Sequence, residues 1–218
     1  MKQTQRGFTL VEIAIVLVIV GLILGGVLKG QEMISNAKVR NIVDQTTAVQ
    51  TAVLAFQDRY RALPGDYGSA TTNITGVVGN GNGDGFVNTA NEFGYFWQHL
   101  GNAGFITGSF NGASVVMNNL ACAQATCPTN AFGGAMKYGW GIVAAAATTS
   151  AHELRIGSNI PVNVMAEIDR KIDDGVPETG TFRLDRNLNL ATCRTGAGAG
   201  STYNVTGGQT NCAGVRIN

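Results

Sequence analysis

The pattern of apolar positions changes at Lys29, within the first sixty residues of the chain. Before Lys29, the segment Ile13–Leu28 contains no charged residue, and the whole apolar span is Phe8–Leu28. A helix of this span is about 31 Å long, which is close to the thickness of the hydrocarbon core of a bilayer. The sequence therefore predicts a membrane-spanning helix at residues 8–28.

After Lys29 the apolar residues become periodic. They recur three and four positions apart, which is the spacing of one face of an amphipathic helix. These residues, called the apolar seam below, are Ile42, Thr46, Val49, Val53, Phe56 and Tyr60. The first proline is Pro64, and the residue before a proline is disfavoured in a helix. We therefore expect one helix from Phe8 to Ala62, whose second half, residues 29–63, packs through the seam.

Residues 64–218 predict one head domain that is rich in loops. Runs of Gly, Asn and Thr separate short segments that are rich in β-branched and aromatic residues. The expected strands are Val115–Met117, Tyr138–Ala144, Leu154–Ile156, Thr181–Leu184 and Val215–Ile217. With the long N-terminal helix, this pattern indicates the α+β fold class.

Two further helices are expected in the head. Glu92–Leu100 has an aromatic stripe that should pack against the apolar seam, and the stripe consists of Phe93, Phe96, Trp97 and Leu100. Pro161–Gly175 should begin with Asn163 as its N-cap. The polar face of this helix has four carboxylates, Glu167, Asp169, Asp173 and Asp174. We expect this face to be exposed to solvent, and a cation site is the alternative.

The charge and histidine content argues against several functions. Fifteen Lys and Arg stand against fourteen Asp and Glu, a net charge of +1, so no nucleic-acid partner is expected. The chain has two histidines, His99 and His152, and neither lies near a nucleophile and a carboxylate at a spacing that suggests catalysis. The sequence therefore predicts that the protein is not an enzyme.

Residues 80–92 resemble an EF-hand or dockerin-type calcium loop, with glycine at loop position 6. The predicted ligands are Asn80, Asn82, Asp84, Phe86, Asn88, Asn91 and Glu92. Three of the usual carboxylate positions hold Asn, and Glu92 comes one residue late. Two interpretations are open: a calcium site, whose affinity should be weak, and a pair of Asn-Gly turns without a metal. No other cofactor is expected.

The four cysteines allow three disulfide connectivities. An exported domain lies in an oxidising compartment, where disulfides form. Local pairing is the simplest choice and joins Cys122 to Cys127 and Cys193 to Cys212. A zinc site is disfavoured because neither pair has Cys-x-x-Cys spacing.

The N-terminus is basic before the apolar span begins. Lys2 and Arg6 precede the span, which predicts a cytoplasmic N-terminus and an exported head. A cleaved signal peptide is the alternative, but no small-x-small cleavage site follows Leu28. Glu12 is the exception within the apolar span. A carboxylate at the edge of an apolar span costs about 2.5–3.5 kcal/mol, so Glu12 implies a partner; the alternative is that its side chain extends to the membrane interface.

The hexapeptide Gly7-Phe8-Thr9-Leu10-Val11-Glu12, between a basic leader and an apolar helix, resembles the processing motif of type IV pilins and type II secretion pseudopilins. The resemblance covers residues 1–62. It implies that a prepilin peptidase cuts between Gly7 and Phe8, that the new Phe8 amine is N-methylated, and that Glu12 pairs with a Phe8 amine during assembly. It also implies a long helix packed on a small antiparallel β-sheet.

The function implied by this resemblance is structural. The chain would consist of a cleaved leader (1–7), a transmembrane and assembly segment (8–28), an amphipathic segment (29–63) and a head (64–218). Its expected partners are other pilin or pseudopilin subunits, the prepilin peptidase and an inner-membrane assembly platform. The subunit would wait in the inner membrane with its head in the periplasm and then enter an exported filament. The alternatives are a type II secretion pseudopilin and a minor tip pilin that acts as an adhesion or binding module.

Overall fold

The computed structural model describes residues 9–117, 122–188 and 190–217. The chain divides into two units, the first ending at Lys38 and the second beginning at Val39. Its helices are α1 (Leu10–Tyr60), α2 (Ala70–Asn73), α3 (Ala90–Asn102), α4 (Val162–Ile172) and α5 (Leu190–Cys193), with 3₁₀ turns at Gly198–Gly200 and Val205–Gly207. Its strands are β1 (Lys137–Gly141), β2 (Ala151–Arg155), β3 (Phe182–Leu184), β4 (Arg194–Thr195), β5 (Thr202–Tyr203) and β6 (Gly214–Ile217).

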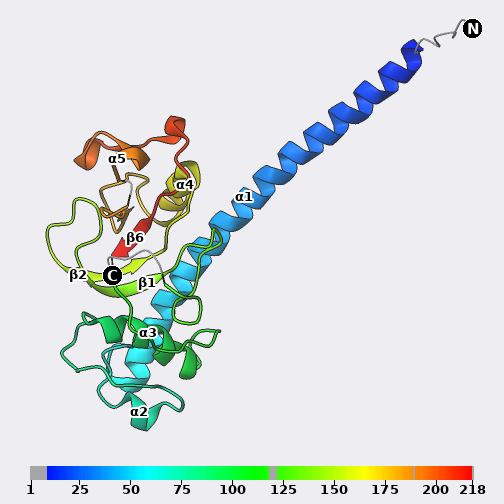
Figure 1. The fold of residues 1–218 in the computed structure, drawn as a ribbon. Helices are drawn as coiled ribbons and strands as arrows, with labels where there is room; N and C mark the ends of the chain where they lie inside the picture. The colour runs from blue at the N-terminus through cyan, green and yellow to red at the C-terminus, as the bar shows by residue number, and fades with distance from the viewer. Residues whose placement is uncertain (1–8, 118–121, 189, 218) are drawn as a thin grey trace, which may run out of the picture. The chain divides into compact units, whose positions relative to one another are not determined.

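Helix α1 is continuous from the first unit into the second (Figure 1). It ends at Tyr60, two residues before the predicted end at Ala62. Arg61 adopts a left-handed conformation with φ of 56°, and its amide still donates to the Gln57 carbonyl at 2.8 Å. A residue in this conformation cannot continue a right-handed helix. The helix therefore ends at Tyr60, before the position at which Pro64 would have ended it.

The apolar seam is buried in the second unit, as its spacing predicts. The residues of α1 that are buried are Val39, Ile42, Thr46, Val49, Ala52, Val53 and Phe56. Tyr60, the last residue of the seam, is half-buried and lies against Phe56 with 4.6 Å between the ring centroids. The Thr46 hydroxyl donates to the Ile42 carbonyl at 2.7 Å, which satisfies the one polar group of the buried seam.

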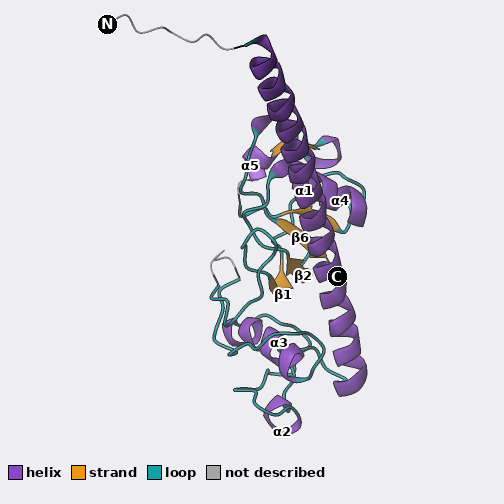
Figure 2. Ribbon diagram, turned by 90° about the vertical axis from the view of Figure 1, so that its right-hand side faces the viewer, coloured by secondary structure: helices purple, strands orange, loops and turns teal. Residues whose placement is uncertain are grey.

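The main sheet has four antiparallel strands in the order β1-β2-β6-β3. The last strand of the chain, β6, therefore lies between β2 and β3, and its Arg216 is opposite both Leu154 and Phe182. A second, two-stranded sheet joins β4 to β5. Figure 2 shows how much of the chain after α1 is loop rather than strand. The α+β fold class with a small antiparallel sheet is confirmed.

Four of the five expected strand segments contain a strand, but Val115–Met117 does not, and that prediction is wrong. The side chains of Val115 and Met117 are buried, whereas that of Val116 is exposed. The Lys137 ammonium binds the Val116 carbonyl at 2.8 Å, and the Arg155 guanidinium binds the Met117 carbonyl. Charged side chains therefore occupy the backbone carbonyls that a neighbouring strand would otherwise use. A short apolar run has the same sequence pattern whether its carbonyls pair with a neighbouring strand or bind charged side chains, so the pattern alone does not distinguish the two cases.

The buried residues of the second unit form two clusters. One contains Val49, Val53 and Phe56 of α1, the aromatic stripe of α3, and Tyr138 and Leu154 of the sheet. The other contains Val39 and Ile42 of α1 together with buried residues of α4, β3 and the chain's last disulfide. The seam of α1 contributes to both clusters, so the helix is an integral part of the head's core.

Helices α3 and α4 match the two short helices expected in the head, with two corrections at α4. The residue that caps α4 is Pro161, and no side chain in the described part of the chain caps it, so Asn163 lies inside the first turn and is exposed. Asp169 was expected on a solvated face, but it is fully buried. Asp169 is buried because Tyr203, in the loop closed by the Cys193–Cys212 disulfide, packs against it and donates a hydrogen bond to its carboxylate.

Candidate functional site

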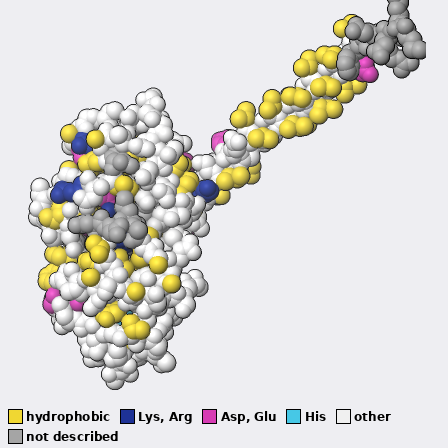
Figure 3. Space-filling view, viewed as in Figure 1, with side chains coloured by type: hydrophobic (Ala, Val, Ile, Leu, Met, Phe, Trp, Pro, Cys, Tyr) yellow, Lys and Arg dark blue, Asp and Glu magenta, His cyan; other side chains and the backbone are white. Residues whose placement is uncertain are grey.

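The first half of α1 has no apolar partner within its own unit. Every large hydrophobic side chain between Leu10 and Leu28 is exposed, from 45% for Val20 to 91% for Leu10. Figure 3 shows hydrophobic side chains along the visible face of this part of the helix. Among the described residues, α1 is the one helix whose length and composition would allow it to cross a membrane.

At the start of α1, Thr9 and Glu12 bond to each other reciprocally. The Thr9 amide and hydroxyl each donate to Glu12 Oε2 at 2.8 Å, and the Glu12 amide donates to Thr9 Oγ1 at 3.3 Å. This arrangement is a capping box, which satisfies amide groups that have no partner at the start of a helix. The Glu12 carboxylate therefore lies at the first turn, next to the backbone of Thr9.

Charged groups bound the apolar surface at both ends. Glu12 is the only acidic residue before Glu32 in the sequence. At the other end, the Lys29 ammonium binds the Glu32 carboxylate at 2.7 Å, and both side chains are exposed. Between Leu10 and Leu28 the one charged residue is therefore Glu12, near the start of the helix.

The profile of the prokaryotic N-terminal methylation motif matches residues 2–28. These residues are a prepilin motif. The motif is that of type IV pilins and pseudopilins, and the matched residues include Lys2, Arg6, Glu12 and the exposed apolar part of α1. Gly7 and Phe8 lie within the matched range but outside the described residues. Comparison with curated proteins and with solved structures gives no match.

The head that follows the prepilin motif contains the glycine-rich loop predicted to bind calcium. This loop folds around the buried carboxylate of Asp66, from the Leu63-Pro64-Gly65-Asp66 turn. The Gly83 amide donates to Asp66 at 2.7 Å, and the Gly85 amide donates at 2.8 Å. A Cβ atom on Gly81 would lie 2.2 Å from the Asp66 backbone, so only glycine fits there. The loop amides therefore surround a carboxylate of the protein itself.

The predicted calcium ligands fall into two groups. The side-chain amides of Asn82 and Asn88 both donate to Asp84 Oδ2, at 3.0 and 3.2 Å, so three of the predicted ligands meet. Asn80 instead accepts from the Thr71 amide at 2.8 Å, and Asn91 accepts from the Ser114 hydroxyl. Phe86 contributes its ring to the surface, 4.5 Å from that of Trp140.

Glu92, the remaining predicted ligand, caps helix α3. Its carboxylate accepts from the Asn88 and Thr89 amides at 3.0 Å each and from the Asn82 amide at 3.2 Å. The Thr89 hydroxyl completes a second capping box by accepting from the Glu92 amide at 3.3 Å. Oxygen atoms that accept from amides are less available to a cation, and this holds for Asp84 as well, whose Oδ1 accepts from the Phe86 amide at 2.8 Å and whose Oδ2 accepts from both asparagines. Calcium binding at this loop therefore stays a hypothesis, and a bound ion would have to replace these hydrogen bonds.

Both local disulfides are present in the structure. Cys122 is bonded to Cys127, and Cys193 is bonded to Cys212. The second disulfide encloses β4, β5 and the two 3₁₀ turns. It packs in the core beside α4, which ties the C-terminal loop to the body of the head.

Three carboxylates meet at the end of α4, from Asp169, Asp173 and Asp174. The Tyr203 hydroxyl donates to Asp169 at 2.7 Å. The Asp173 carboxylate accepts from the Phe182 amide at 2.8 Å, and that of Asp174 accepts from the Val176 amide at 2.9 Å. Burial raises the pKa of Asp169 to about 6, and the same burial raises the pKa of Tyr203.

Four charged residues are buried beside the sheet. Arg155 forms an ion pair with Asp185, and both side chains are at most 3% exposed. Glu153 accepts from the Val143 amide at 2.8 Å, and burial raises its pKa. Burial lowers the pKa of Lys137 to about 8. These groups bind backbone atoms of loops, so we interpret them as the means by which loops are held on the sheet.

The structural roles of Asp66 and His99 could not be read from the sequence pattern. His99 is fully buried, its Nδ1 accepts from the Gly65 amide at 3.0 Å, and its Nε2 is 3.2 Å from the Gly79 carbonyl. Burial lowers its pKa to about 4. No local motif marks either residue, because their partners lie 17 to 34 positions away in the chain. The two capping boxes did carry a local signal, Thr-x-x-Glu, at Thr9 and at Thr89.

Proposed function

We propose that this protein is the structural subunit of an exported, type IV pilus-like filament. A prepilin peptidase cuts between Gly7 and Phe8, the Phe8 amine is methylated, and the mature subunit waits in the inner membrane. The subunit then leaves the membrane and packs its N-terminal helix against those of other subunits. The single observation that carries this proposal is the fully exposed apolar surface of α1 within a matched prepilin motif.

The energetics of that surface support assembly. Large apolar side chains are each stabilised by about 1.5–3 kcal/mol when they leave water. All such side chains from Leu10 to Leu28 lack a partner within the chain's first unit, so the segment has to be covered by lipid or by other helices. Lipid covers it before assembly, and helices of neighbouring subunits cover it in the filament.

The position of Glu12 supports a role in subunit register. Cleavage after Gly7 would place a new ammonium group on Phe8, one residue before Thr9. The Glu12 carboxylate is already in the first turn, where it accepts from Thr9. A buried carboxylate and a buried ammonium each favour a position where the other is present. We therefore assign Glu12 as the charge that fixes how far each new helix enters the filament.

The proposed maturation can be tested with the mass of the chain recovered from membranes. The mature protein should lack residues 1–7 and carry one methyl group on Phe8. Gly7→Val should abolish both changes, because a β-branched side chain replaces the residue at the cut. Recovery of the wild-type chain with Met1 still attached, in a water-soluble monomer, would contradict the proposal.

A deletion strain distinguishes the pilus from the secretion pseudopilus. Loss of surface fibres with normal secretion is the result expected for a pilus subunit. Loss of secretion of folded enzymes with fibres intact would assign the chain to a pseudopilus. Intact fibres with lost surface attachment would indicate a minor tip pilin with an adhesive head.

A further inference from the structure

The two disulfides of the head differ in the exposure of their cysteine residues. Cys193 and Cys212 are both fully buried in the core beside α4. Cys127 is also fully buried, but its partner Cys122 is only half-buried. One disulfide therefore has a cysteine at the surface, and the other is enclosed.

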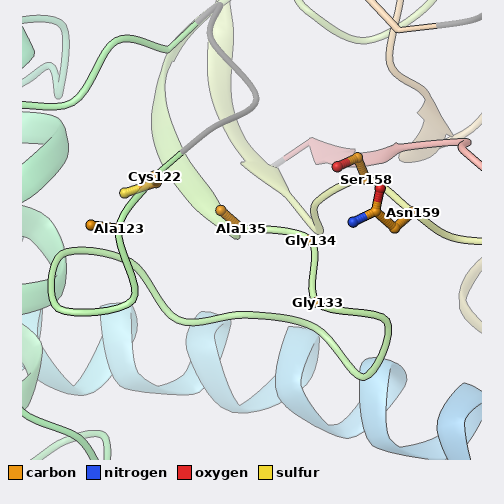
Figure 4. A pocket seen from close by; sticks show the side chains of 7 residues that line it. All are labelled: Cys122, Ala123, Gly133, Gly134, Ala135, Ser158 and Asn159. Atoms are coloured by element: carbon orange, nitrogen blue, oxygen red, sulfur yellow. The ribbon is translucent and has the colours of Figure 1, made fainter.

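Cys122 lines an open depression of about 550 Å³ on the head. The other lining residues are Ala123, Gly133, Gly134, Ala135, Ser158 and Asn159, and Figure 4 shows them around the depression. None of these seven residues has a charged or bulky side chain. A thiolate can therefore approach without meeting a like charge or a steric barrier from the lining.

We propose that Cys122–Cys127 is a thiol–disulfide exchange site, which a dithiol can reduce and the corresponding reagent disulfide can oxidise again, while Cys193–Cys212 stays oxidised. Exchange requires direct contact between the attacking thiolate and one sulfur of the disulfide. Cys122 is half-buried and lines the depression, whereas Cys127, Cys193 and Cys212 are fully buried, so we assign the sulfur of Cys122 as the point of attack. This proposal does not depend on the proposed filament function.

The reaction transfers two electrons from the dithiol to the cysteine pair. One thiolate of the dithiol forms a bond to Sγ of Cys122 as the Cys122–Cys127 bond breaks. Cys127 leaves with the bonding electrons and takes up a proton. The second thiol of the reagent loses its proton and attacks the reagent sulfur in the mixed disulfide. Cys122 is then released, takes up a proton, and the reagent becomes a disulfide.

The turn around this disulfide has hydrogen bonds that do not involve sulfur. The Cys127 amide donates to the Ala123 carbonyl at 3.0 Å. The Asn111 amide donates to the Ala125 carbonyl at 2.7 Å, and the Thr126 hydroxyl donates to Asn111 Oδ1 at 2.9 Å. These contacts should survive reduction, so the change should remain local and reversible.

The test treats the full-length protein in detergent, at neutral pH, with increasing concentrations of dithiothreitol. Free thiols are then blocked with N-ethylmaleimide and located by peptide mass spectrometry. Cys122 and Cys127 should be labelled at a dithiothreitol concentration at least tenfold below that needed for Cys193 and Cys212. Labelling of all four cysteines at one concentration, or of the C-terminal pair first, would overturn the proposal.

Two tryptophan variants test the route through the depression. Ala123→Trp places a large side chain in the lining, and the rate of reduction of Cys122–Cys127 should fall several-fold. Ala125→Trp is the matched control, because Ala125 is exposed on the same turn but does not line the depression. Persistence of the oxidised Cys193–Cys212 bond reports that each variant is folded. Equal rates in the two variants would refute the assigned route.

Discussion

The two halves of helix α1 have the same secondary structure but opposite relations to water. Between Leu10 and Leu28 every large hydrophobic side chain is exposed, whereas from Val39 to Phe56 apolar residues at helical spacing are buried in two core clusters. Helix formation is therefore not what distinguishes the halves. The second half is therefore stabilised by contacts within one molecule, whereas the apolar side chains of the first half need lipid or other molecules to cover them.

The strongest test of this difference is Glu12→Ala. We expect normal processing and normal head stability but loss of filament assembly, because a neighbouring Phe8 ammonium would have no carboxylate partner. Filaments recovered by shearing and counted by electron microscopy provide the measurement. Glu32→Ala is the control, since it removes an exposed carboxylate that pairs only with Lys29 in the described chain. Wild-type fibres from Glu12→Ala would show that the charge has no role in assembly.

Truncation of one apolar side chain in each half should separate stability from assembly. Phe56 is fully buried and contacts aromatic rings of Tyr60, Tyr67, His99 and Phe105. Phe56→Ala should lower the free energy of unfolding of the head by about 3–5 kcal/mol. Leu17→Ala, at a side chain 66% exposed, should leave it unchanged. Urea denaturation in detergent followed by tryptophan fluorescence measures both, and equal losses would contradict the division.

The carboxyl group of Asp169 contributes stability to the head that is lost as the pH rises. Its folded pKa, about 6, is above the ordinary value of 3.8, so its contribution is fully present below pH 3.8 and is lost as the pH passes 6. A shift of this size corresponds to about 3 kcal/mol at most. Buried His99, whose folded pKa is about 4, contributes the opposite trend to the wild type and to the variant alike, so the quantity to compare is the difference between them. In urea denaturation, the excess stability of the wild type over Asp169→Asn should shrink by up to this amount between pH 4 and 7.

Asp174→Asn is the control for the prediction about pH. A hydrogen bond from Thr179 lowers the pKa of Asp174, so its contribution is present at neutral pH and is lost as the pH falls. The difference in stability between the wild type and this variant should not shrink between pH 4 and 7. The prediction is wrong if the difference shrinks for both variants or for neither.

The same Thr→Ala substitution can be made in both capping boxes, which compares the head with the first unit by one chemical change. Thr89→Ala removes the hydroxyl that caps α3 and should destabilise the head by about 1 kcal/mol. Thr9→Ala removes the matching hydroxyl in the first unit and should leave the unfolding of the head unchanged. Thermal unfolding of the two variants side by side provides the measurement. A loss of the same size from Thr9→Ala would mean that the first turn of α1 contributes to the stability of the head, contrary to this prediction.

Calcium should have the smallest effect, and only on the head. For a dissociation constant near 1 mM, 1 mM Ca²⁺ stabilises a protein by about 0.4 kcal/mol. Calorimetry with calcium or a chelator should show a small rise in melting temperature that Asp84→Ala abolishes. Identical melting curves with and without calcium would remove residues 80–92 as a metal site.

The sequence predicted the features of the fold that depend on nearby residues. Periodic spacing located the apolar seam and both short helices, and short loops located both disulfides. Val115–Met117 was assigned to a strand because the side chains that bind its carbonyls, from Lys137 and Arg155, lie 21 and 38 residues away. Spacing along a chain does not report contacts at such distances.

The residues of the candidate site could likewise be predicted only where they lie close together in the sequence. The prepilin motif is contiguous, so its residues could be named from the sequence alone. The burial of Asp169 could not, because it depends on Tyr203, 34 residues further on, which the enclosed C-terminal loop brings back to α4. The packing of the loop at 80–92 around Asp66 could not be predicted either, because Asp66 lies 17 and 19 residues from the amides that donate to it, and calcium binding by the loop stays a prediction.

The ring of His99 gives the head a built-in spectroscopic reporter. Its two nitrogens face groups of opposite character, the Gly65 amide and the Gly79 carbonyl, which selects the tautomer with the proton on Nε2. The ¹⁵N chemical shifts of the ring record that tautomer and need neither crystals nor free tumbling. Solid-state NMR on intact fibres could therefore report whether the turn at Gly65 keeps its native hydrogen bonds when the molecule is polymerised.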